Sequence, residues 1–315
     1  MYIYKSNDAV PWDECVATIG FFDGVHAGHR FLLNELKKIA EEEQKISVAI
    51  TFDVHPRKVL KSDFQPKLLT TLDEKIDLLS TTGVDACVVL NFTKELSLLS
   101  ASEFLKDILL KKIKVRTLLV GHDHRFGHNR LENFADYAEY GHSLGMKVIQ
   151  AQKYVTNETH HISSSEIRHA LEQGDLAQAN KLLTYPFVLT GIVKSGFQVG
   201  RKIGFPTANL FPDAEDKILP ATGVYAVRVK WENHEYKGMM NIGHRPTINY
   251  SEEKTLEVHV IDFEGDIYNR NLKIEFILKI RDEMKFGSVE ELIAQLKKDK
   301  NTVINLNFNE VEKHY

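Results

Sequence analysis

The sequence of 315 residues predicts two domains of different classes: an α/β domain with a parallel sheet, then a small antiparallel β-barrel closed by a terminal helix. The chain is longer than one typical domain. Strand-like and helical patterns alternate in its first half, whereas apolar residues at every second position dominate its second half. Pro186 disfavours continuation of the helical pattern Asp175–Leu183, so we expect domains of residues 1–184 and 185–315.

The first half contains short apolar runs separated by amphipathic patterns. The expected strands are Cys15–Phe22, Ile46–Phe52, Val84–Leu90, Thr117–Gly121 and Met146–Gln150. The expected helices are Arg30–Glu43, Asp73–Ser80, Ala101–Lys111 and Asn133–Leu144. Such βαβ units are right-handed and place helices on both faces of a parallel sheet, whose ligands bind beyond the carboxyl ends of the strands.

The second half shows the period-two pattern of a half-buried antiparallel sheet. The residues expected to share an apolar face are Tyr225, Val227, Val229 and Trp231; Leu256, Val258 and Val260; and Leu272, Ile274, Phe276, Leu278 and Ile280. Ser288 and Glu291 form a capping box that predicts the start of the closing helix. Its core stripe is Val289, Leu292, Ile293 and Leu296.

Composition excludes several classes of protein. Lys and Arg number 40 against 44 Asp and Glu, a net charge of −4, so the chain lacks the basic excess typical of nucleic-acid binding. Its two cysteines, Cys15 and Cys87, lie in apolar strands and predict buried thiols, not a disulfide framework or a zinc site. The polar N-terminus does not resemble a signal peptide, and no apolar run approaches the ~20 residues of a spanning helix. We expect a cytoplasmic chain with no membrane or nucleic-acid partner, and no obligatory protein partner is evident.

The most informative stretch is Gly20–Leu33, which reads GFFDGVHAGHRFLL. A strand is expected to end at Phe22, Asp23 and Gly24 to form a tight turn, and a helix to begin near Gly28. The N–H groups at the start of a helix are unpaired and favour anions. Since glycine has no side chain, a phosphate could approach the backbone closely at this point.

His26 and His29 lie at this expected helix start. Two imidazoles there could donate hydrogen bonds to phosphate oxygens as charge builds in a transition state. Two alternatives stay open: turn residues without a role in catalysis, and ligands of zinc. A zinc site needs a third ligand and fits a glycine-rich helix start poorly.

The second candidate element is Ile162–Arg168, which reads ISSSEIR. Ser163, Ser164 and Ser165 could cap a helix and bind phosphate oxygens. Arg168 lies one turn further and could reach the same anion. Alone the pattern is weak, since serines cap many helices.

Together the two elements resemble the nucleotidylyltransferase superfamily, with its HxGH and S-S-x-x-I-R signatures, and the fuller match resembles the FMN adenylyltransferase module of bacterial bifunctional FAD synthetases. The resemblance implies a Rossmann-like domain that binds ATP, with His26, His29 and Arg168 as catalytic groups. The residues that it assigns to ATP and its phosphates are Gly20, Phe21, Asp23, Gly24, Gly28, Asp123, Ser163, Ser164 and Ser165.

Two further segments resemble this family and depart from it at one position each. In Thr51–Leu60, TFDVHPRKVL, Val54 stands where the family has proline. In Val120–Arg130, VGHDHRFGHNR, His124 replaces an aromatic residue. The residues that the resemblance marks as candidate flavin contacts in this domain are His55 and Arg57. For His55 and for Asp123, a role in stabilising a loop stays open.

A glycine-rich stretch, Gly191–Leu210, carries the chemistry of the second half. Lys194 and Arg201 add positive charge beside glycines that admit phosphates. The oxygens of Thr207 and Asn209 are two residues apart, so in an extended segment both face one Mg²⁺. No P-loop motif is present in the sequence.

Glu257 is the candidate base of this domain. On the expected strand Leu256–Asp262, Glu257 and His259 face away from the apolar residues, which leaves the carboxylate free to serve a site. The plain alternative is an exposed strand carboxylate without a role in catalysis.

The second half resembles riboflavin kinase. The segments that match are GRKIGFPTAN (Gly200–Asn209), GVYAV (Gly223–Val227), MNIGHRPT (Met240–Thr247), LEVHVIDF (Leu256–Phe263) and IRDEMKFGSVEELIAQL (Ile280–Leu296). The resemblance implies a six-stranded barrel that uses MgATP, with Thr207 and Asn209 on metal and phosphate and Glu257 as base. It adds Gly200, Arg201, Gly204 and Pro206 as phosphate contacts, and Arg281 and Phe286 as candidate flavin contacts. Thr184 and Asn269 stand where the family carries glycine, and we expect local changes of turn there.

The residue types match two successive reactions. A hydroxyl acceptor needs a carboxylate base such as Glu257, whereas an acceptor that is already a phosphate needs positive and donor groups such as His26 and His29. Together, the two resemblances imply a bifunctional enzyme that converts riboflavin to FMN and FMN to FAD, consumes ATP twice and releases pyrophosphate, and the residue types agree with this. The alternatives are a nucleotidylyltransferase for another phosphorylated acceptor or CTP, and a flavin-binding regulator with one inactive domain.

Overall fold

The computed structural model describes residues 1–60, 66–122, 125–128, 132–154, 162–194, 200, 203–244 and 254–315. The chain forms two compact units, Met1–Pro66 with Leu72–His161 and Lys67–Thr71 with Ile162–Tyr315. These units differ in extent from the expected domains 1–184 and 185–315, and that division stays a prediction.

The described part of the first unit is built on a parallel six-stranded sheet in the order β1-β4-β3-β2-β5-β6. Its strands are β1 Tyr2–Lys5, β2 Cys15–Ile19, β3 Ile46–Phe52, β4 Ala86–Leu90, β5 Val115–Val120 and β6 Lys147–Gln150. Its helices are α1 Ala27–Glu42, α2 Pro56–Val59, α3 Leu72–Ser80, α4 Lys94–Leu98, α5 Ala101–Glu103, the π-helix η1 Phe104–Lys112 and α6 Phe134–Ser143. The expected α/β class is confirmed.

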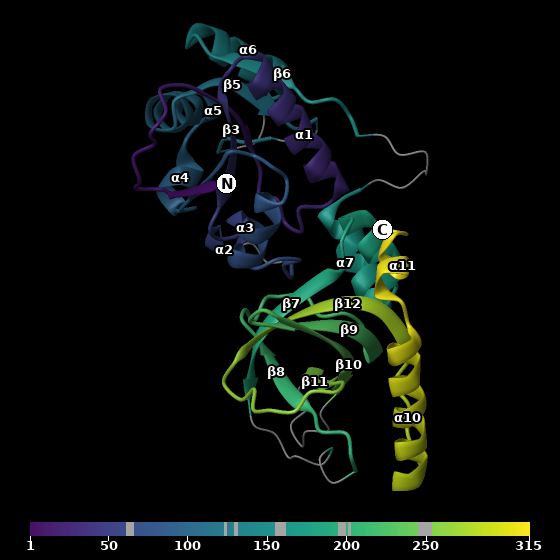
Figure 1. Cartoon of the computed structure of the whole chain (residues 1–315). Coiled ribbons are helices and arrows are strands. Elements are labelled where there is room, and N and C mark those ends of the chain that lie inside the picture. Colours follow the sequence, from purple (N-terminus) through teal and green to yellow (C-terminus); the bar gives the residue numbers. More distant parts are fainter. Residues whose placement is uncertain are drawn as a thin grey trace. The chain divides into compact units, whose positions relative to one another are not determined.

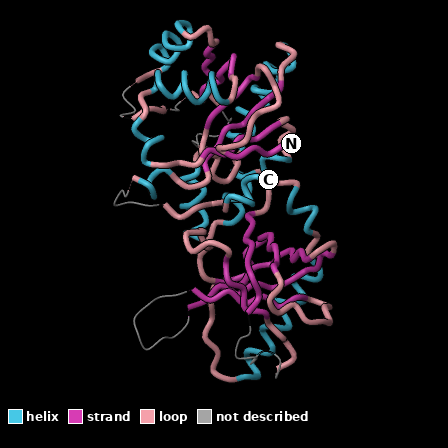
Figure 2. Tube along the Cα trace, turned by 90° about the vertical axis from the view of Figure 1, so that its left-hand side faces the viewer, coloured by secondary structure: helices cyan, strands magenta, loops and turns pink. Residues whose placement is uncertain are grey.

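Helices cover both faces of this sheet (Figures 1 and 2). Cys15 and Ala17 of β2 pack in one apolar cluster with η1 and α6, and Val16 packs in another with α1 and α3. Strands buried on both faces are typical of a parallel sheet. The order reverses between β2 and β5, so the segment that follows β2 lies at the switch point where such sheets bind ligands.

Sequence patterns missed some of these elements. Strand β1 and the short helices α2 and α4 were not expected. The run expected as a strand to Phe22 ends at Ile19, and Phe22 itself adopts a positive φ of 53°, which a strand does not contain.

The described part of the second unit contains a closed barrel with the strand order β10-β11-β8-β7-β12-β9. Its strands are β7 Phe187–Lys194, β8 Ala208–Pro212, β9 Gly223–Trp231, β10 His234–His244, β11 Lys254–Val260 and β12 Asn271–Arg281. Its helices are α7 Ser164–Gln173, α8 Leu176–Leu183, α10 Val289–Asn305 and α11 Phe308–Glu312. The expected antiparallel barrel and terminal helix are confirmed.

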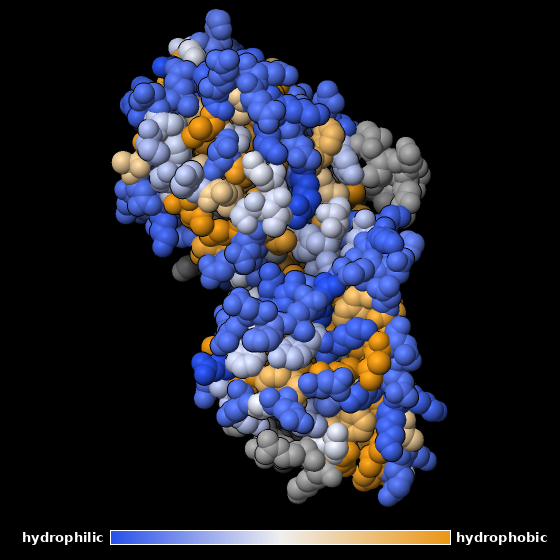
Figure 3. All heavy atoms as spheres, viewed as in Figure 1, coloured by the Kyte–Doolittle hydropathy of each residue, from blue (hydrophilic) through white to orange (hydrophobic). Residues whose placement is uncertain are grey.

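Helices α7 and α8 share the core of the barrel. Leu171 and Leu183 pack in one cluster with the barrel residues Leu189, Tyr225 and Phe276. On the outside, α10 runs along the barrel, and hydrophobic side chains gather along the inner side of this helix (Figures 1 and 3). Residues such as Ala226 are therefore buried although they point away from the barrel core, so the expectation of a sheet with one exposed face is wrong for β9.

The expected single apolar face of β12 is also wrong. Ile274 and Phe276 point into the barrel, but Leu278 and Ile280 pack in the outer cluster under α10. The register against β9 shifts between Phe276 and Leu278, and such a bulge adds a residue that reverses the alternation.

The two departures from the family's glycines fall on left-handed residues. Thr184 ends α8 with φ 68°, and Asn269 has φ 58°. Asparagine tolerates this region, but a β-branched threonine is strained there. The departure at Asn269 is thus well accommodated, whereas Thr184 leaves strain in an exposed cap.

Replacing Thr184 by glycine is expected to raise the free energy of unfolding by about 0.5–1 kcal/mol, because relief of left-handed strain outweighs the greater entropy of glycine in the unfolded chain. Urea denaturation followed by fluorescence measures the change. Thr184→Ala is the control, since it keeps a Cβ and the strain. An equal gain from alanine would contradict this explanation.

Candidate active sites

In the first unit, the segment that follows β2 forms a sharp turn at residues 22–25. Phe22 and Val25 have positive φ of 53° and 37°, and Gly24 has φ 81°. Asp23 is 3% exposed. A side chain at Gly20 would approach the Phe22 ring to 2.9 Å. Strained residues of this kind persist only where their surroundings hold them, and they cluster at functional sites.

The structure brings the two predicted histidines together at the start of α1. The rings of His26 and His29 stack with their centroids 3.6 Å apart. His26 is the N-cap of α1, and its Nδ1 accepts the backbone N–H of His29 at 3.4 Å. A neutral His26 therefore carries its proton on Nε2, where it is a donor. A side chain at Gly28 would press against the His26 ring at 3.3 Å, so glycine keeps this helix start open.

Phe21 and His55 lie beside each other in the same unit. Their rings meet edge to face at 4.7 Å. His55 caps α2 by accepting the backbone N–H of Arg57 at 3.2 Å, which supports the loop-stabilising role left open above. Arg57 is exposed. Val54, which replaces a proline, donates its backbone N–H to Asp53 Oδ1 at 2.7 Å, a bond that proline could not form.

Lys75 is a residue of this site that sequence analysis missed. Its side chain is buried, and Nζ donates to the Phe52 carbonyl at 2.8 Å and lies 4.2 Å from the centre of the Phe21 ring. Burial lowers the pKa of Lys75 to about 8, although Asp23 opposes the change. The available signal was spacing: Lys75 lies four residues before Leu79 and so on the buried face of α3.

Lys75 predicts a pH dependence of stability. Its pKa is about 8 in the folded chain, against 10.5 for an unperturbed lysine, so between these values the unfolded chain binds more protons and the folded state gains stability as pH rises. Relative to Lys75→Met, the wild type should gain on the order of 3 kcal/mol between pH 7 and 10.5.

Urea denaturation at several pH values measures this gain in a Trp231→Phe background. Trp12, the other of the two tryptophans, then reports on the first unit. If the free energy of unfolding changed equally with pH in the two proteins, this would contradict a buried Lys75 with a lowered pKa.

The second predicted phosphate element forms α7 in the second unit. Ser163 is its N-cap, and Ser164 and Ser165 begin its first turn. Nε of Arg168 donates to the Lys67 carbonyl at 2.6 Å, within the same unit. The histidines belong to the first unit, so the predicted meeting of the two elements around one anion stays a prediction. Asp123, His124 and Arg201 lie outside the described residues.

The glycine-rich loop of the second unit closes on itself before β8. The Phe205 N–H donates to the Gly200 carbonyl at 2.8 Å, and a side chain at Gly200 would collide with the Phe205 carbonyl. Gly204 has φ 81°. Glycine is therefore required at two points of a loop that leads directly to Thr207 and Asn209.

The two predicted metal ligands of the second unit, Thr207 and Asn209, lie beside the predicted base, Glu257. The Thr207 hydroxyl donates to Glu257 Oε2 at 3.2 Å. In the sheet, Glu257 of β11 lies between Asn209 of β8 and Asn241 of β10, which are its register partners in the two neighbouring strands. Glu257 is half-buried and hydrogen-bonded, which differs from the plain alternative of an exposed carboxylate. Hydroxyl, amide and carboxylate oxygens form the hard donor set that Mg²⁺ prefers.

His259 lies two residues beyond Glu257 and is 7% exposed. Its Nδ1 lies 2.8 Å from the Pro206 carbonyl, and its ring meets Phe205 edge to face at 5.4 Å. Burial lowers the pKa of His259, and the bond to Pro206 partly offsets the effect, so the imidazole is neutral at pH 7.

The two candidate flavin residues of the second unit also lie together. The Arg281 guanidinium is 5.9 Å from the centre of the Phe286 ring. Its Nε and Nη2 contact Asp299 Oδ2 at 3.0 and 2.9 Å, and Asp299 is 2% exposed. This ion pair holds the arginine against α10.

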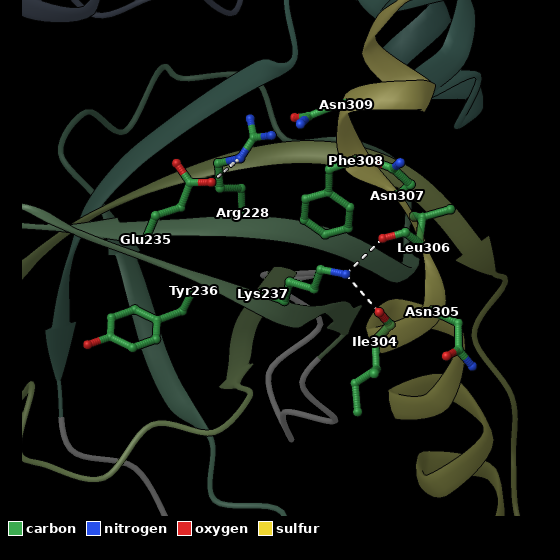
Figure 4. A pocket seen from close by; sticks show the side chains of 10 residues that line it. All are labelled: Arg228, Glu235, Tyr236, Lys237, Ile304, Asn305, Leu306, Asn307, Phe308 and Asn309. Carbon is green, nitrogen blue, oxygen red and sulfur yellow. Dashed lines mark hydrogen bonds and ion pairs between the residues drawn. The ribbon is translucent and has the colours of Figure 1, made fainter.

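A cavity of about 420 Å³ lies elsewhere on this unit (Figure 4). It is lined by Arg228, Glu235, Tyr236, Lys237, Ile304, Asn305, Leu306, Asn307, Phe308 and Asn309. Lys237 donates to the carbonyls of Ile304 and Leu306, and Arg228 pairs with Glu312 of α11. These cations anchor the C-terminal segment, and the predicted site residues do not line the cavity.

Both cysteines are buried and free, as expected, and burial raises the pKa of each thiol to about 12. Within the described ranges, no cluster of three or more His, Cys, Asp or Glu could hold a metal ion. A search of the same residues found no helix with the length and apolar character needed to cross a bilayer.

Two family models match the chain, FAD synthetase over residues 9–166 and riboflavin kinase over residues 183–307. The bifunctional riboflavin kinase/FMN adenylyltransferase of Escherichia coli (strain K12) is 37% identical over 293 residues, which cover 93% of this chain and 92% of the relative. The protein of that name from Listeria monocytogenes is 37% identical over 303 residues, 95% of each chain. A crystal structure titled as a macrolide-efflux protein from Streptococcus pneumoniae has a TM-score of 0.87 at 31% identity and covers 98% of this chain and 100% of that chain.

Proposed function

The chain belongs to the family of bifunctional riboflavin kinases/FMN adenylyltransferases, and from this premise we propose how its residues divide the two reactions. The second unit, which contains the barrel, phosphorylates riboflavin with ATP. The domain with the parallel sheet, which matches the FAD synthetase model, then adenylylates FMN to FAD and releases pyrophosphate. The observation that carries this assignment is that each module matches its own family model and holds side chains suited to that reaction.

In the kinase reaction the acceptor is a hydroxyl that is not ionised at neutral pH, so a base must take its proton. We assign this role to Glu257, whose carboxylate is oriented by the Thr207 hydroxyl. Thr207 and Asn209 would hold Mg²⁺ together with the phosphates of ATP, and the ion would neutralise charge on the transferred phosphoryl group. The convergence of these oxygens supports the assignment.

In the adenylyl transfer the acceptor is the phosphate of FMN, which is already an anion. The site therefore needs positive and donor groups in place of a base. His26, His29 and the start of α1 supply donors where charge moves onto pyrophosphate. We propose that Ser163 and Arg168 bind phosphate oxygens of ATP. The buried free thiols support the cytoplasmic location that we also propose.

Two incubations test the assignment. Purified chain with riboflavin, Mg²⁺ and ATP is expected to yield FMN and then FAD, while FMN with ATP yields FAD and pyrophosphate. Replacing ATP by CTP in the second incubation separates FAD synthesis from another nucleotidyl transfer. Tight binding of riboflavin without any product would favour a flavin-binding regulator and overturn the proposal.

A further inference from the structure

The strand pairing next to Glu257 ends in an unusual way. Glu257 and Val258 of β11 pair with Asn209 and Ala208 of β8, and the ladder stops there. The next position on β11 is His259. Its imidazole reaches past the end of the ladder to the Pro206 carbonyl at 2.8 Å. A side chain of β11 thus contacts the segment just before β8, where the backbone pairing of the two strands has ended.

The Pro206 carbonyl determines which nitrogen of the His259 ring carries the proton. A carbonyl oxygen only accepts hydrogen bonds, so Nδ1 of His259 carries the proton and Nε2 of the neutral ring carries a lone pair. Nε2 is buried and has no hydrogen-bond partner among the described residues. A buried polar atom without a partner destabilises a fold, and an apolar side chain of similar size would avoid this. Packing alone therefore does not explain a histidine at this position.

The contact acts on the residue that orients the presumed base of the kinase reaction. Pro206 lies between Phe205, which is buried in the outer cluster of the barrel, and Thr207, whose hydroxyl donates to Glu257. Holding the Pro206 carbonyl fixes the plane of the peptide that joins Pro206 to Thr207, because that peptide is rigid. This plane restricts where the Cα and the side chain of Thr207 can lie.

We propose that His259 is a positioning residue of the kinase site, where its Nδ1–H holds the Pro206 carbonyl and thereby aims the Thr207 hydroxyl at Glu257 and at the phosphates of ATP. The inference rests on the proposed roles of Thr207 and Glu257. His259 takes no proton from the substrate, because Nδ1 is engaged and Nε2 is buried.

Two substitutions in the full chain separate positioning from packing. Asparagine at this position places an amide N–H near the site of Nδ1, whereas leucine fills similar space without a donor. Each variant is assayed for FMN formation from riboflavin and for FAD formation from supplied FMN, and its urea denaturation is recorded. His259→Leu is expected to lower kcat for FMN formation by about 10- to 100-fold, as loss of an orienting contact typically does, with FAD formation unchanged and stability equal or higher. His259→Asn is expected to restore kcat to within about 5-fold of the wild type.

Two results would overturn the inference. One is a kcat for FMN formation that stays within about twofold of the wild type in His259→Leu. The other is an equal loss of kcat and of stability in both variants, which indicates packing alone.

A spectroscopic measurement tests the contact without turnover. In ¹⁵N-labelled chain, the imidazole signals of His259, identified by their loss in His259→Asn, are expected to show the neutral Nδ1–H tautomer at pH 7. The Nε2–H tautomer would exclude the bond to Pro206. If the wild type forms no FMN at all, the proposed function fails, and the tautomer still decides whether His259 holds the loop.

Discussion

Replacing Glu257 by glutamine is expected to stop FMN formation while FMN supplied to the same protein is still converted to FAD. Glutamine keeps the shape of the side chain and an oxygen that can accept from Thr207, but it cannot take the proton of the acceptor hydroxyl. Loss of a general base lowers kcat by about 10²- to 10⁴-fold. Separation of flavins after incubation with riboflavin and MgATP measures the effect.

The control for this experiment is Glu264→Gln, which changes an exposed carboxylate shortly after β11. It should retain both activities. Wild-type rates of FMN formation in Glu257→Gln would remove Glu257 from the role of base. Loss of both activities in a folded Glu257→Gln protein would show that the two reactions do not use separate sites.

Replacing His29 by alanine is expected to have the opposite outcome, with FMN accumulating and FAD absent. The His29 ring stacks on His26 at the start of α1, so its loss removes one donor and the support of the other. Removal of one preorganised donor to developing charge lowers kcat by about 10²- to 10³-fold. The measurement is pyrophosphate release from ATP and supplied FMN.

The matched control is His142→Ala, an exposed histidine in the last turn of α6 in the same unit. It should form FAD at the wild-type rate. His26→Ala and the double variant complete the series. Because stacked residues act as a unit, the double variant should lose much less than the product of the single losses. Full FAD formation in His29→Ala would exclude the stacked pair as the adenylyl-transfer site.

Local patterns predicted the main elements because they depend on neighbouring residues. The run Ile46–Phe52 is a strand with the expected bounds, and the helix expected near Gly28 begins at Ala27. Ser288 accepts the Glu291 N–H as the capping pattern predicts, but the Glu291 carboxylate accepts from the Gly287 N–H and not from Ser288, so only half of the predicted capping box forms. The alternation in β12 failed beyond Phe276, since a bulge is decided by the partner strand and leaves no local signal in the apolar pattern.

By itself the sequence determined the class of each unit and two histidines near a helix start, because strand period, turn residues and cap residues act over a few positions. It also singled out Thr207, Asn209 and Glu257, whose roles stay a prediction. Only the tertiary structure decided the contacts that support these groups. Lys75 meets Phe52 across 23 positions and His259 meets Pro206 across 53. No local sequence pattern indicates which distant residue a lysine in a helix or a histidine on a strand will contact. Their roles follow from burial, which forces each polar group to find a partner among whatever the fold places beside it.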